Sequence, residues 1–207
     1  MFDRHSDETY VRLETDGWIV GRKTMAAYAK GTARSGLAQG TVPRRSHAAD
    51  RKGRPLAVGI DPHGRLHYGA DEILGDHVVA IIGEQVSDDY LAELRRDGVS
   101  YAFAGPDGQN LAAALDWIGT TFGANSLALQ GGAITNGAFL KAGLIDEISV
   151  RIYPGIDGLT GVASIFECVG APGEKPAAGQ SLRHLTTETL DGGLVWIRYA
   201  VEKSPSS

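Results

Sequence analysis

The sequence predicts an α/β fold, a three-layer α/β/α sandwich with a mostly parallel central sheet and a C-terminal antiparallel hairpin. Short apolar runs rich in β-branched residues alternate with segments whose apolar residues recur at helical spacing. Several of these runs lack strict alternation, as is typical of strands buried on both faces. With 207 residues, 43% of them hydrophobic, the chain can bury one sizeable core, so we expect residues 1–207 to form a single domain.

The first elements are a helix, a strand and a second helix. Ser6 is a candidate N-cap, and the acidic turn and apolar stripe after it predict a helix over about 6–16 that stops at Gly17. Residues 18–20 form an apolar run that ends at Gly21, and the segment after it has the spacing of a short helix.

Residues 31–54 are predicted to form a long basic loop within this domain. The segment holds six Arg or Lys residues and one acid, Asp50. Loops of this length are uncommon in compact domains and are usually functional or mobile. Two interpretations stay open: a solvated excursion, or a flap close to a phosphorylated ligand, because guanidinium groups match phosphate oxygens in pairs.

The rest of the chain alternates predicted strands with predicted helices. The strand candidates are residues 56–61, 77–83, 99–105, 126–132 and 147–155. The helix candidates are residues 87–97, 109–122 and 136–142, each followed by a glycine. This alternation predicts parallel pairing of the strands.

The C-terminal tail has a different pattern, because two β-like stretches flank the hairpin signal at residues 191–193. We expect an antiparallel addition at the sheet edge. Its second stretch alternates between two sides, one with Trp196, Arg198 and Ala200 and the other with Val195, Ile197, Tyr199 and Val201.

Charge and cysteine content exclude several functional classes. The net charge of −5 gives no electrostatic reason to bind nucleic acid or an anionic membrane surface. No run approaches the ~20 apolar residues that span a bilayer, and the N-terminal residues are too polar for a signal peptide. A single cysteine, Cys168, indicates a reducing compartment, so we expect a cytoplasmic protein. The scattered histidines predict no metal site.

Candidate ligand-binding residues lie where predicted strands end, because ligands of open α/β sheets bind at the carboxyl ends of the strands. After the first strand, Gly21 permits a tight exit and Arg22, Lys23 and Thr24 suit a phosphate clamp. An ordinary strand-to-helix turn with exposed basic residues is the alternative.

A pair of glycines follows the strand candidate 126–132. Gly131 and Gly132 would let the backbone approach a flat or charged ligand, and a helix beginning near Thr135 would direct N–H groups at a diphosphate. The G-x-G-x-x-G fingerprint is absent, since Ala133 follows Gly132, and there is no Walker A motif. A simple tight turn is the alternative.

In this order, the two clusters resemble a known family. The stretch GWIVGRKT, followed about 110 residues later by LALQGGAITNGAFLKAGLIDEISVRIYPGIDG, resembles the reductase domain of bacterial riboflavin biosynthesis, the RibD C-terminal family. The resemblance covers nearly the whole chain. It implies a dihydrofolate reductase-like fold and an NADPH-dependent reductase, usually a homodimer. Such a reductase converts 5-amino-6-(5-phosphoribosylamino)uracil, a phosphorylated pyrimidine, to the ribitylamino product.

The resemblance also implies roles for individual residues. Gly21, Arg22 and Thr24 match the family's cofactor phosphate site, with Arg22 suited to the adenosine 2′-phosphate. The turn and helix start that cradle the diphosphate match Gly132, Ala133, Ile134, Thr135 and Asn136, with Gly131 directly before them. Gln130 departs from the family, in which this substrate-contacting position is commonly Glu. Gln keeps the hydrogen bonding but cannot act as an acid or base.

Two residues after the second strand are candidates for substrate contacts. Asp61 could orient substrate or ribose hydroxyls, and Arg65 could meet the substrate phosphate. A turn-forming aspartate before Pro62 and a solvated arginine are the alternatives. No residue identifies itself as the proton donor, so no catalytic residue is assigned.

A second departure concerns the start of the chain. The family normally opens with a strand carrying a Ser-x-Asp-Gly type motif, and nothing before Trp18 supplies it. Either native residues precede Met1, or the sheet lacks a central member. Three functions therefore stay open: the riboflavin-pathway reductase, a same-fold NADPH reductase for another acceptor such as dihydrofolate, and a non-catalytic nucleotide-binding dimeric protein.

Overall fold

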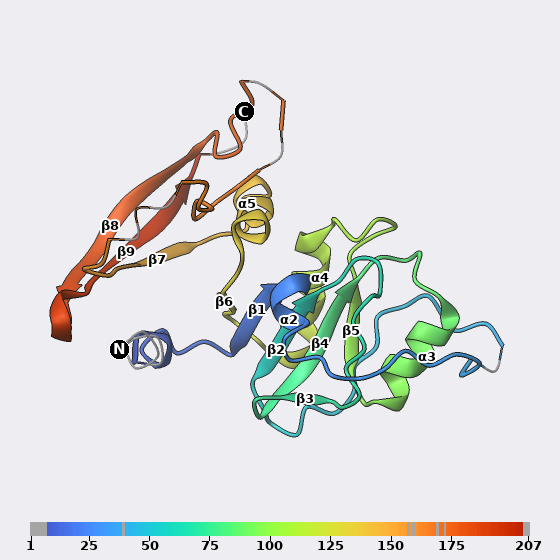
Figure 1. Ribbon diagram of the computed structural model, residues 1–207. Coiled ribbons are helices and arrows are strands. Elements are labelled where there is room, and N and C mark those ends of the chain that lie inside the picture. The colour runs from blue at the N-terminus through green and yellow to red at the C-terminus, as the bar shows by residue number, and fades with distance from the viewer. Residues whose placement is uncertain are drawn as a thin grey trace. The chain divides into compact units, whose positions relative to one another are not determined.

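A computed structural model of the chain describes residues 8–38, 40–156, 158, 160–168, 170–171 and 173–204. They belong to two compact units, one ending at Gly132 and the other beginning at Ala133. Each unit has its own sheet (Figure 1).

The first unit contains a mostly parallel sheet. Strand β1 (Gly17–Gly21) lies between β2 (Leu56–Ile60) and β6 (Ala128–Leu129) and is parallel to both. On the far side of β2, strand β4 (Asp76–Ile82) is parallel to β2 and to β5 (Ser100–Phe103). The two-residue strand β3 (Glu72–Ile73) pairs antiparallel with the start of β4.

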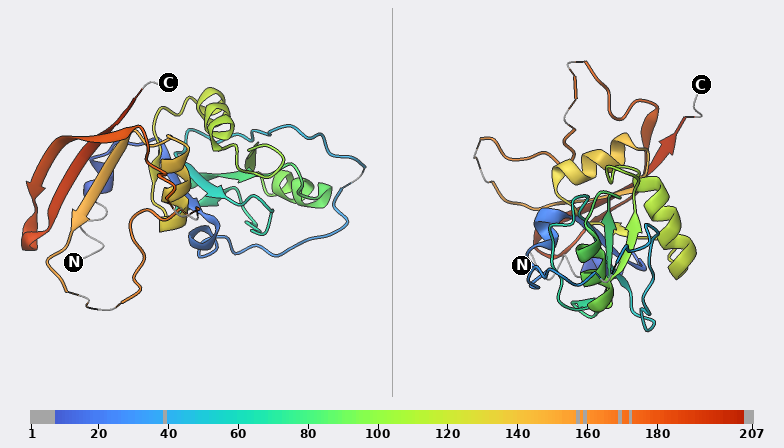
Figure 2. Two further views of the ribbon diagram at one scale, coloured as in Figure 1. Left: turned by 90° about the horizontal axis from the view of Figure 1, so that it is seen from above. Right: turned by 90° about the vertical axis from the view of Figure 1, so that its right-hand side faces the viewer.

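Helices cover both faces of this sheet, as the right-hand view of Figure 2 shows. Helix α3 (Asp88–Arg96) packs Leu91 and Leu94 into the same apolar cluster as Val78 on β4. Neighbouring strand residues point to opposite faces, so His77 lies on the other side, where its ring is 5.9 Å from Phe122 of helix α4 (Leu111–Phe122). The prediction of a strand buried on both faces is therefore confirmed for β4.

Helix boundaries follow the predicted signals in the middle of the chain and depart from them at its start. The Ser87 hydroxyl accepts the Tyr90 N–H at the start of α3, and Gly123 caps the end of α4. The predicted first helix over 6–16 is too long. Among its described residues only 8–11 are helical, and Gly17 opens strand β1.

The basic loop 31–54 is tied to the rest of the first unit along most of its length. Arg34 forms an ion pair with Asp97, Arg44 pairs with Asp88, and the N–H groups of Gly36 and Ala38 donate to Asp89. Farther along, the residues around His47 form an antiparallel bridge to Tyr101 at the outer edge of β5. Asp88 at the start of α3 and Asp97 directly after its end thus neutralise two arginines that the sequence suggested as phosphate ligands.

The second unit consists of helix α5 and an antiparallel sheet. Helix α5 (Ala133–Lys141) starts three residues earlier than predicted, directly after Gly132. Strands β7 (Glu147–Ile152) and β8 (Gln180–Thr189) flank β9 (Val195–Lys203), and a 3-10 turn at Asp191–Gly193 joins β8 to β9. The register confirms the predicted alternation, since Ile197 lies opposite Val150 and Arg198 opposite Ser149.

The α/β prediction with a mostly parallel sheet and a C-terminal antiparallel hairpin is confirmed, with the strands divided between two sheets. In the described part of the chain, no helix combines the length and apolarity needed to cross a membrane.

Candidate cofactor and substrate site

The predicted site residues of the first unit lie where its parallel strands end. Gly21 at the end of β1 pairs with Ile60 at the end of β2, so Arg22 and Asp61 leave the sheet side by side. At the neighbouring strand β6, the Gln130 N–H donates to the Ile19 carbonyl at 2.9 Å, which extends this pairing by one residue. Segments far apart in sequence therefore share one edge.

Arg22 and Thr24 belong to the short helix α2 (Arg22–Met25), which begins directly after β1. Fully buried Met25 anchors this helix in the core, whereas Arg22 is half-buried and Thr24 exposed. Arg22 and Lys23 form no ion pair with any residue that the structure describes. Their cationic groups are therefore available to an anion.

Asp61 has a structural role that the sequence suggested only as an alternative. Its carboxylate is fully buried, and Oδ2 accepts the N–H groups of Arg65 at 2.5 Å and Leu66 at 2.7 Å. The carboxylate thus closes the turn from Asp61 to Leu66. Its proposed contact with substrate stays a prediction, and the observed contacts are those of a turn-forming residue.

Two tyrosines that the sequence reasoning missed lie close to Asp61. Burial and the nearby Asp61 carboxylate raise the pKa of both Tyr68 and Tyr90. The Tyr90 hydroxyl donates to the Leu66 carbonyl at 2.9 Å, which fixes the far end of the Asp61 turn. The only sequence signal was the position of Tyr90 on the apolar stripe of α3.

Arg65 adds a third cation close to the carboxyl ends of β1 and β2. Its backbone is held by Asp61, while its side chain is exposed and has no ion-pair partner among the described residues. Arg22, Lys23 and Arg65, here called the cation group, carry three positive charges, and the neighbouring Asp61 carboxylate is directed into the protein. This arrangement favours binding of phosphate groups.

The loops after three strands meet close to the Asp61 turn. The Gly83 N–H donates to the Pro62 carbonyl at 2.9 Å, and Glu84 N–H donates to the Gly105 carbonyl at 3.1 Å. A Cβ at position 83 would lie 2.9 Å from that carbonyl oxygen of Pro62. Glycine is thus required here by the close packing of the first unit's loops, which holds the end of β2 in place.

Gln130, Gly131 and Gly132 form the chain that leaves β6. The Gln130 side chain is exposed and is therefore accessible to a ligand. Its amide group cannot act as an acid or base. Gly132 has a φ of +75°, and a Cβ built on it would meet nothing within 4 Å. The left-handed backbone explains the glycine, and the open space beside it leaves room for a ligand.

The remaining cofactor candidates form the first turn of α5 in the second unit. Ile134 is 62% exposed, and Ala133 and Thr135 are half-buried. Asn136 uses its side-chain N–H to bind the Ile165 carbonyl at 3.0 Å, and the Glu167 N–H donates to the Ala133 carbonyl at 2.9 Å. The segment around residues 164–168 thus packs along α5, and Asn136 holds it there.

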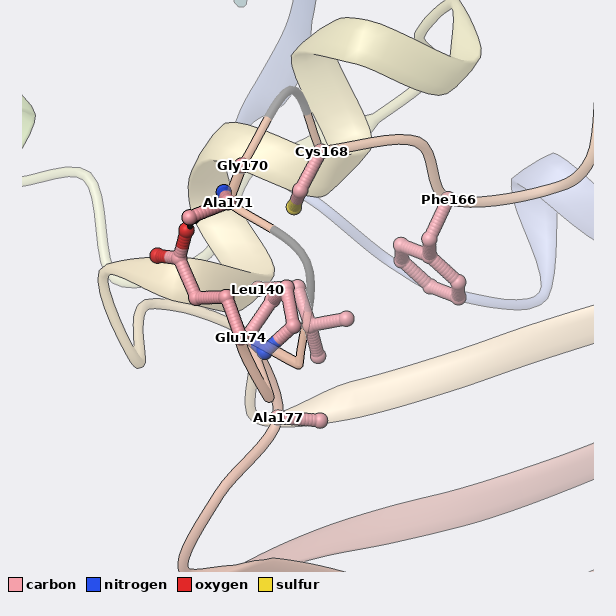
Figure 3. Close-up of a pocket in the computed structure, with 8 residues that line it drawn as sticks. Leu140, Phe166, Cys168, Gly170, Ala171, Glu174 and Ala177 are labelled. Carbon is pink, nitrogen blue, oxygen red and sulfur yellow. Dashed lines mark hydrogen bonds between the residues drawn. The ribbon is translucent and has the colours of Figure 1, made fainter.

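A pocket of about 310 Å³ lies in the second unit and is separate from the predicted site residues. Leu140, Phe166, Cys168 and Glu174 are among the residues that line it (Figure 3). Glu174 forms an ion pair with Lys141. That ion pair lowers the pKa of Glu174. None of the predicted cofactor or substrate residues contributes to the lining.

A buried polar cluster lies at the other end of β4, at its first residues. His77 Nε2 is 2.7 Å from the Ser100 hydroxyl, and Arg54 binds Asp71 at 2.5 Å. Burial and Arg54 lower the pKa of His77. Within the described ranges no three His, Cys, Asp or Glu residues are arranged to hold a metal ion.

Comparisons with known proteins show the family of this chain. The model of the RibD C-terminal domain family matches residues 4–195. Among curated proteins, no sequence match was found.

Solved structures from two bacteria share the fold of this chain. A pyrimidine reductase-like protein from Corynebacterium diphtheriae is 16% identical, with a TM-score of 0.62 over 92% of this chain and 77% of that protein. Acinetobacter baumannii RibD is 19% identical, with a TM-score of 0.60 over 96% of this chain. The chain spans half the length of that RibD.

Proposed function

Because this chain belongs to the RibD C-terminal domain family, whose reductases use a nicotinamide cofactor, we propose that it reduces 5-amino-6-(5-phosphoribosylamino)uracil with NADPH. The product would be the ribitylamino compound of riboflavin biosynthesis. A cytoplasmic location is part of this proposal, as is the absence of nucleic-acid and membrane partners.

The observation that carries the proposal is the cation group at the carboxyl ends of β1 and β2. Arg22, Lys23 and Arg65 have no ion-pair partners in the described chain, whereas Arg34, Arg44 and Arg54 all pair with acids. Unpaired cations at a strand-end edge suit a ligand with several phosphates. NADPH and the phosphorylated substrate both carry phosphate groups.

The residues present fit the cofactor. Arg22 would bind the adenosine 2′-phosphate, with Thr24 as a hydroxyl donor, and Gly131 and Gly132 would bring the backbone against the diphosphate. The open space beside Gly132 supports this assignment. When bound, the nicotinamide supplies the hydride.

The protein's own task is then to position the substrate and exclude water. Arg65 would hold the substrate phosphate, and Gln130 would donate or accept a hydrogen bond at the pyrimidine without exchanging a proton. Since Asp61 is buried and already holds two backbone N–H groups, the proton required as the hydride arrives comes from water in this proposal.

A non-catalytic nucleotide-binding protein is the second candidate. Gln130 at a position that is commonly Glu, and the engagement of Asp61 in a turn, favour it. A same-fold reductase acting on dihydrofolate is a further alternative, which NADPH oxidation with dihydrofolate as the acceptor tests.

The decisive experiment measures NADPH oxidation with the ribosylaminouracil phosphate and, in parallel, with dihydrofolate, using protein that carries any native upstream residues. We expect turnover with the first compound. NADPH binding by calorimetry without turnover of either compound would support the non-catalytic candidate, and an absence of NADPH binding would contradict both.

A further inference from the structure

The histidine of the buried polar cluster at the start of β4 has a neighbour at each ring nitrogen. His77 is fully buried, its Nε2 is 2.7 Å from the Ser100 hydroxyl, and its Nδ1 is 3.3 Å from Nη2 of Arg54. Because a guanidinium group only donates hydrogen bonds, Nδ1 has to accept, and the ring then carries a single proton, on Nε2. The geometry therefore fixes a neutral ring whose Nε2–H is directed at Ser100.

The Ser100 hydroxyl fits this tautomer. Its oxygen accepts the Ala49 N–H at 2.9 Å and has a second lone pair for the Nε2–H of His77. Since Nε2–H is present in the neutral and in the protonated ring, protonation leaves the Ser100 side unchanged. A second proton acts at Nδ1, where it removes the acceptor of Arg54 and places two cations side by side.

The carboxylate of Asp71 lies close to both of these cations. Asp71 Oδ2 accepts a hydrogen bond from Arg54 at 2.5 Å, and the Asp71 carbonyl accepts the N–H of Val78, the residue after His77, at 3.0 Å. A protonated His77 would thus find an acceptor that Arg54 holds when the ring is neutral.

The groups packed around the His77 ring come from several elements. The charged ones are Arg54, Asp71, Asp50 and Arg51. Strand β5 contributes the uncharged Ser100 hydroxyl, and helix α4 contributes the ring of Phe122. Burial and the two arginines lower the pKa of His77, whereas the two aspartates act in the opposite direction.

Arg54 closes a strained turn of the basic loop, formed by residues 51–54 and here called the basic turn. The Arg54 N–H and Nε–H groups both donate to the Arg51 carbonyl, at 3.0 and 2.9 Å. Lys52 has a φ of +54°, a left-handed conformation that is unfavourable for a residue with a side chain. The Arg54 and Lys52 side chains both pair with Asp71, so a change at this one carboxylate affects the whole turn.

We propose that His77 is a proton-operated switch that controls the basic turn. While the ring is neutral, it accepts a hydrogen bond from Arg54, and Arg54 pairs with Asp71. When Nδ1 takes up a proton from solvent, its N–H takes the Asp71 carboxylate as acceptor, Arg54 and Lys52 lose that partner, and the basic turn opens. The switch lies at the end of β4 away from the cation group, so it does not depend on the proposed reductase activity.

Nitrogen-15 NMR of the His77 ring tests the premise, with the signals assigned by their loss in His77→Gln. At about pH 8 we expect the tautomer protonated on Nε2, and a doubly protonated ring only as the pH falls below the ordinary value of 6.5. A ring protonated on Nδ1 at about pH 8 would overturn the proposal, because Nδ1 could not then accept from Arg54.

Amide hydrogen exchange, corrected for the intrinsic effect of pH, tests the consequence. Between about pH 7.5 and 5.5 the protection of the Arg54 N–H should fall about tenfold, because the turn loses a charge-assisted hydrogen bond. The Ala49 N–H is the internal control, since its Ser100 acceptor stays in place. Unchanged protection at Arg54 while the ring titrates, or an equal loss at Ala49, would overturn the proposal.

The variant Asp71→Asn tests the exchange of partners even if His77→Gln does not fold. Its amide cannot neutralise either cation, so the Arg54 N–H should be poorly protected already at about pH 7.5 and should respond little to acid. Glu72→Gln is the matched control, because Glu72 is the neighbouring acid, 3.8 Å from Arg54, and has no part in the switch. It should keep the response of the wild type. A full response in Asp71→Asn, or its loss in Glu72→Gln, would contradict the assigned role of Asp71.

Discussion

Replacing Asp61 by alanine tests whether this residue mainly holds a turn. The substitution removes the acceptor of the Arg65 and Leu66 N–H groups. The Leu66 bond is buried, so its donor is left without a partner, while the Arg65 N–H is closer to solvent. An unsatisfied buried donor costs about 1–3 kcal/mol, and hydrogen bonds to charged groups contribute about 1.5–3 kcal/mol each. Because the carboxylate's own Oδ1 accepts no hydrogen bond from the residues that the structure describes, part of this loss is offset, and we expect about 3 kcal/mol.

The assay is urea and thermal unfolding of the wild type and the variant. For a chain of this length, about 3 kcal/mol corresponds to a Tm lower by roughly 6–12 °C. Asp107→Ala is the control, because Asp107 also accepts a backbone N–H in a turn but is exposed. It should cost no more than about 0.5 kcal/mol. A loss for Asp61→Ala no larger than that of the control would refute the structural role and favour a ligand-binding one.

Three further predictions concern the cofactor residues and the buried histidine. Arg22→Ala should weaken NADPH binding about tenfold or more and NADH binding much less, because one charged hydrogen bond to the 2′-phosphate is lost; equal losses in calorimetry would contradict the assignment. Gly132→Ala should lower stability by about 1 kcal/mol, because alanine is strained at a φ of +75°. Gly155→Ala, at a site with equally open space and no positive φ, should change thermal stability little. Because the folded pKa of His77 lies below its ordinary value of 6.5, the unfolded chain binds the proton first, and stability should fall as pH drops through about 6.5. His77→Gln should reduce this slope in melts between about pH 8 and 5.5, and an unchanged slope would exclude His77 as its source.

The strands and middle helices were predictable because their signals are local. The runs that became β2, β4 and β5 are mainly apolar, and Ser87 and Gly123 mark helix ends by their own chemistry. The alternation of β9 was equally readable, since period two needs only the strand itself.

The features that the sequence did not reveal depend on residues far apart in the chain. Arg34 and Arg44 suggested a phosphate flap until the structure placed Asp97 and Asp88 beside them. The burial of Asp61 could not be predicted from the sequence, because the far end of its turn is fixed by Tyr90, a residue distant in the chain. At Gly132, the sequence did not reveal the positive φ, which strains any β-branched residue at that position.

The bridge between His47 and Tyr101 has a consequence for the free side of the first unit's sheet. It covers the outer edge of β5 with a segment that is also held by the Ser46–Phe103 and Ala49–Ser100 hydrogen bonds and by ion pairs to Asp88 and Asp97. The ion pair of Arg44 with Asp88 is partly exposed to solvent, so salt should weaken this part of the attachment. The residues around His47 occupy hydrogen-bonding groups at the outer edge of β5 that another chain's strand could otherwise pair with.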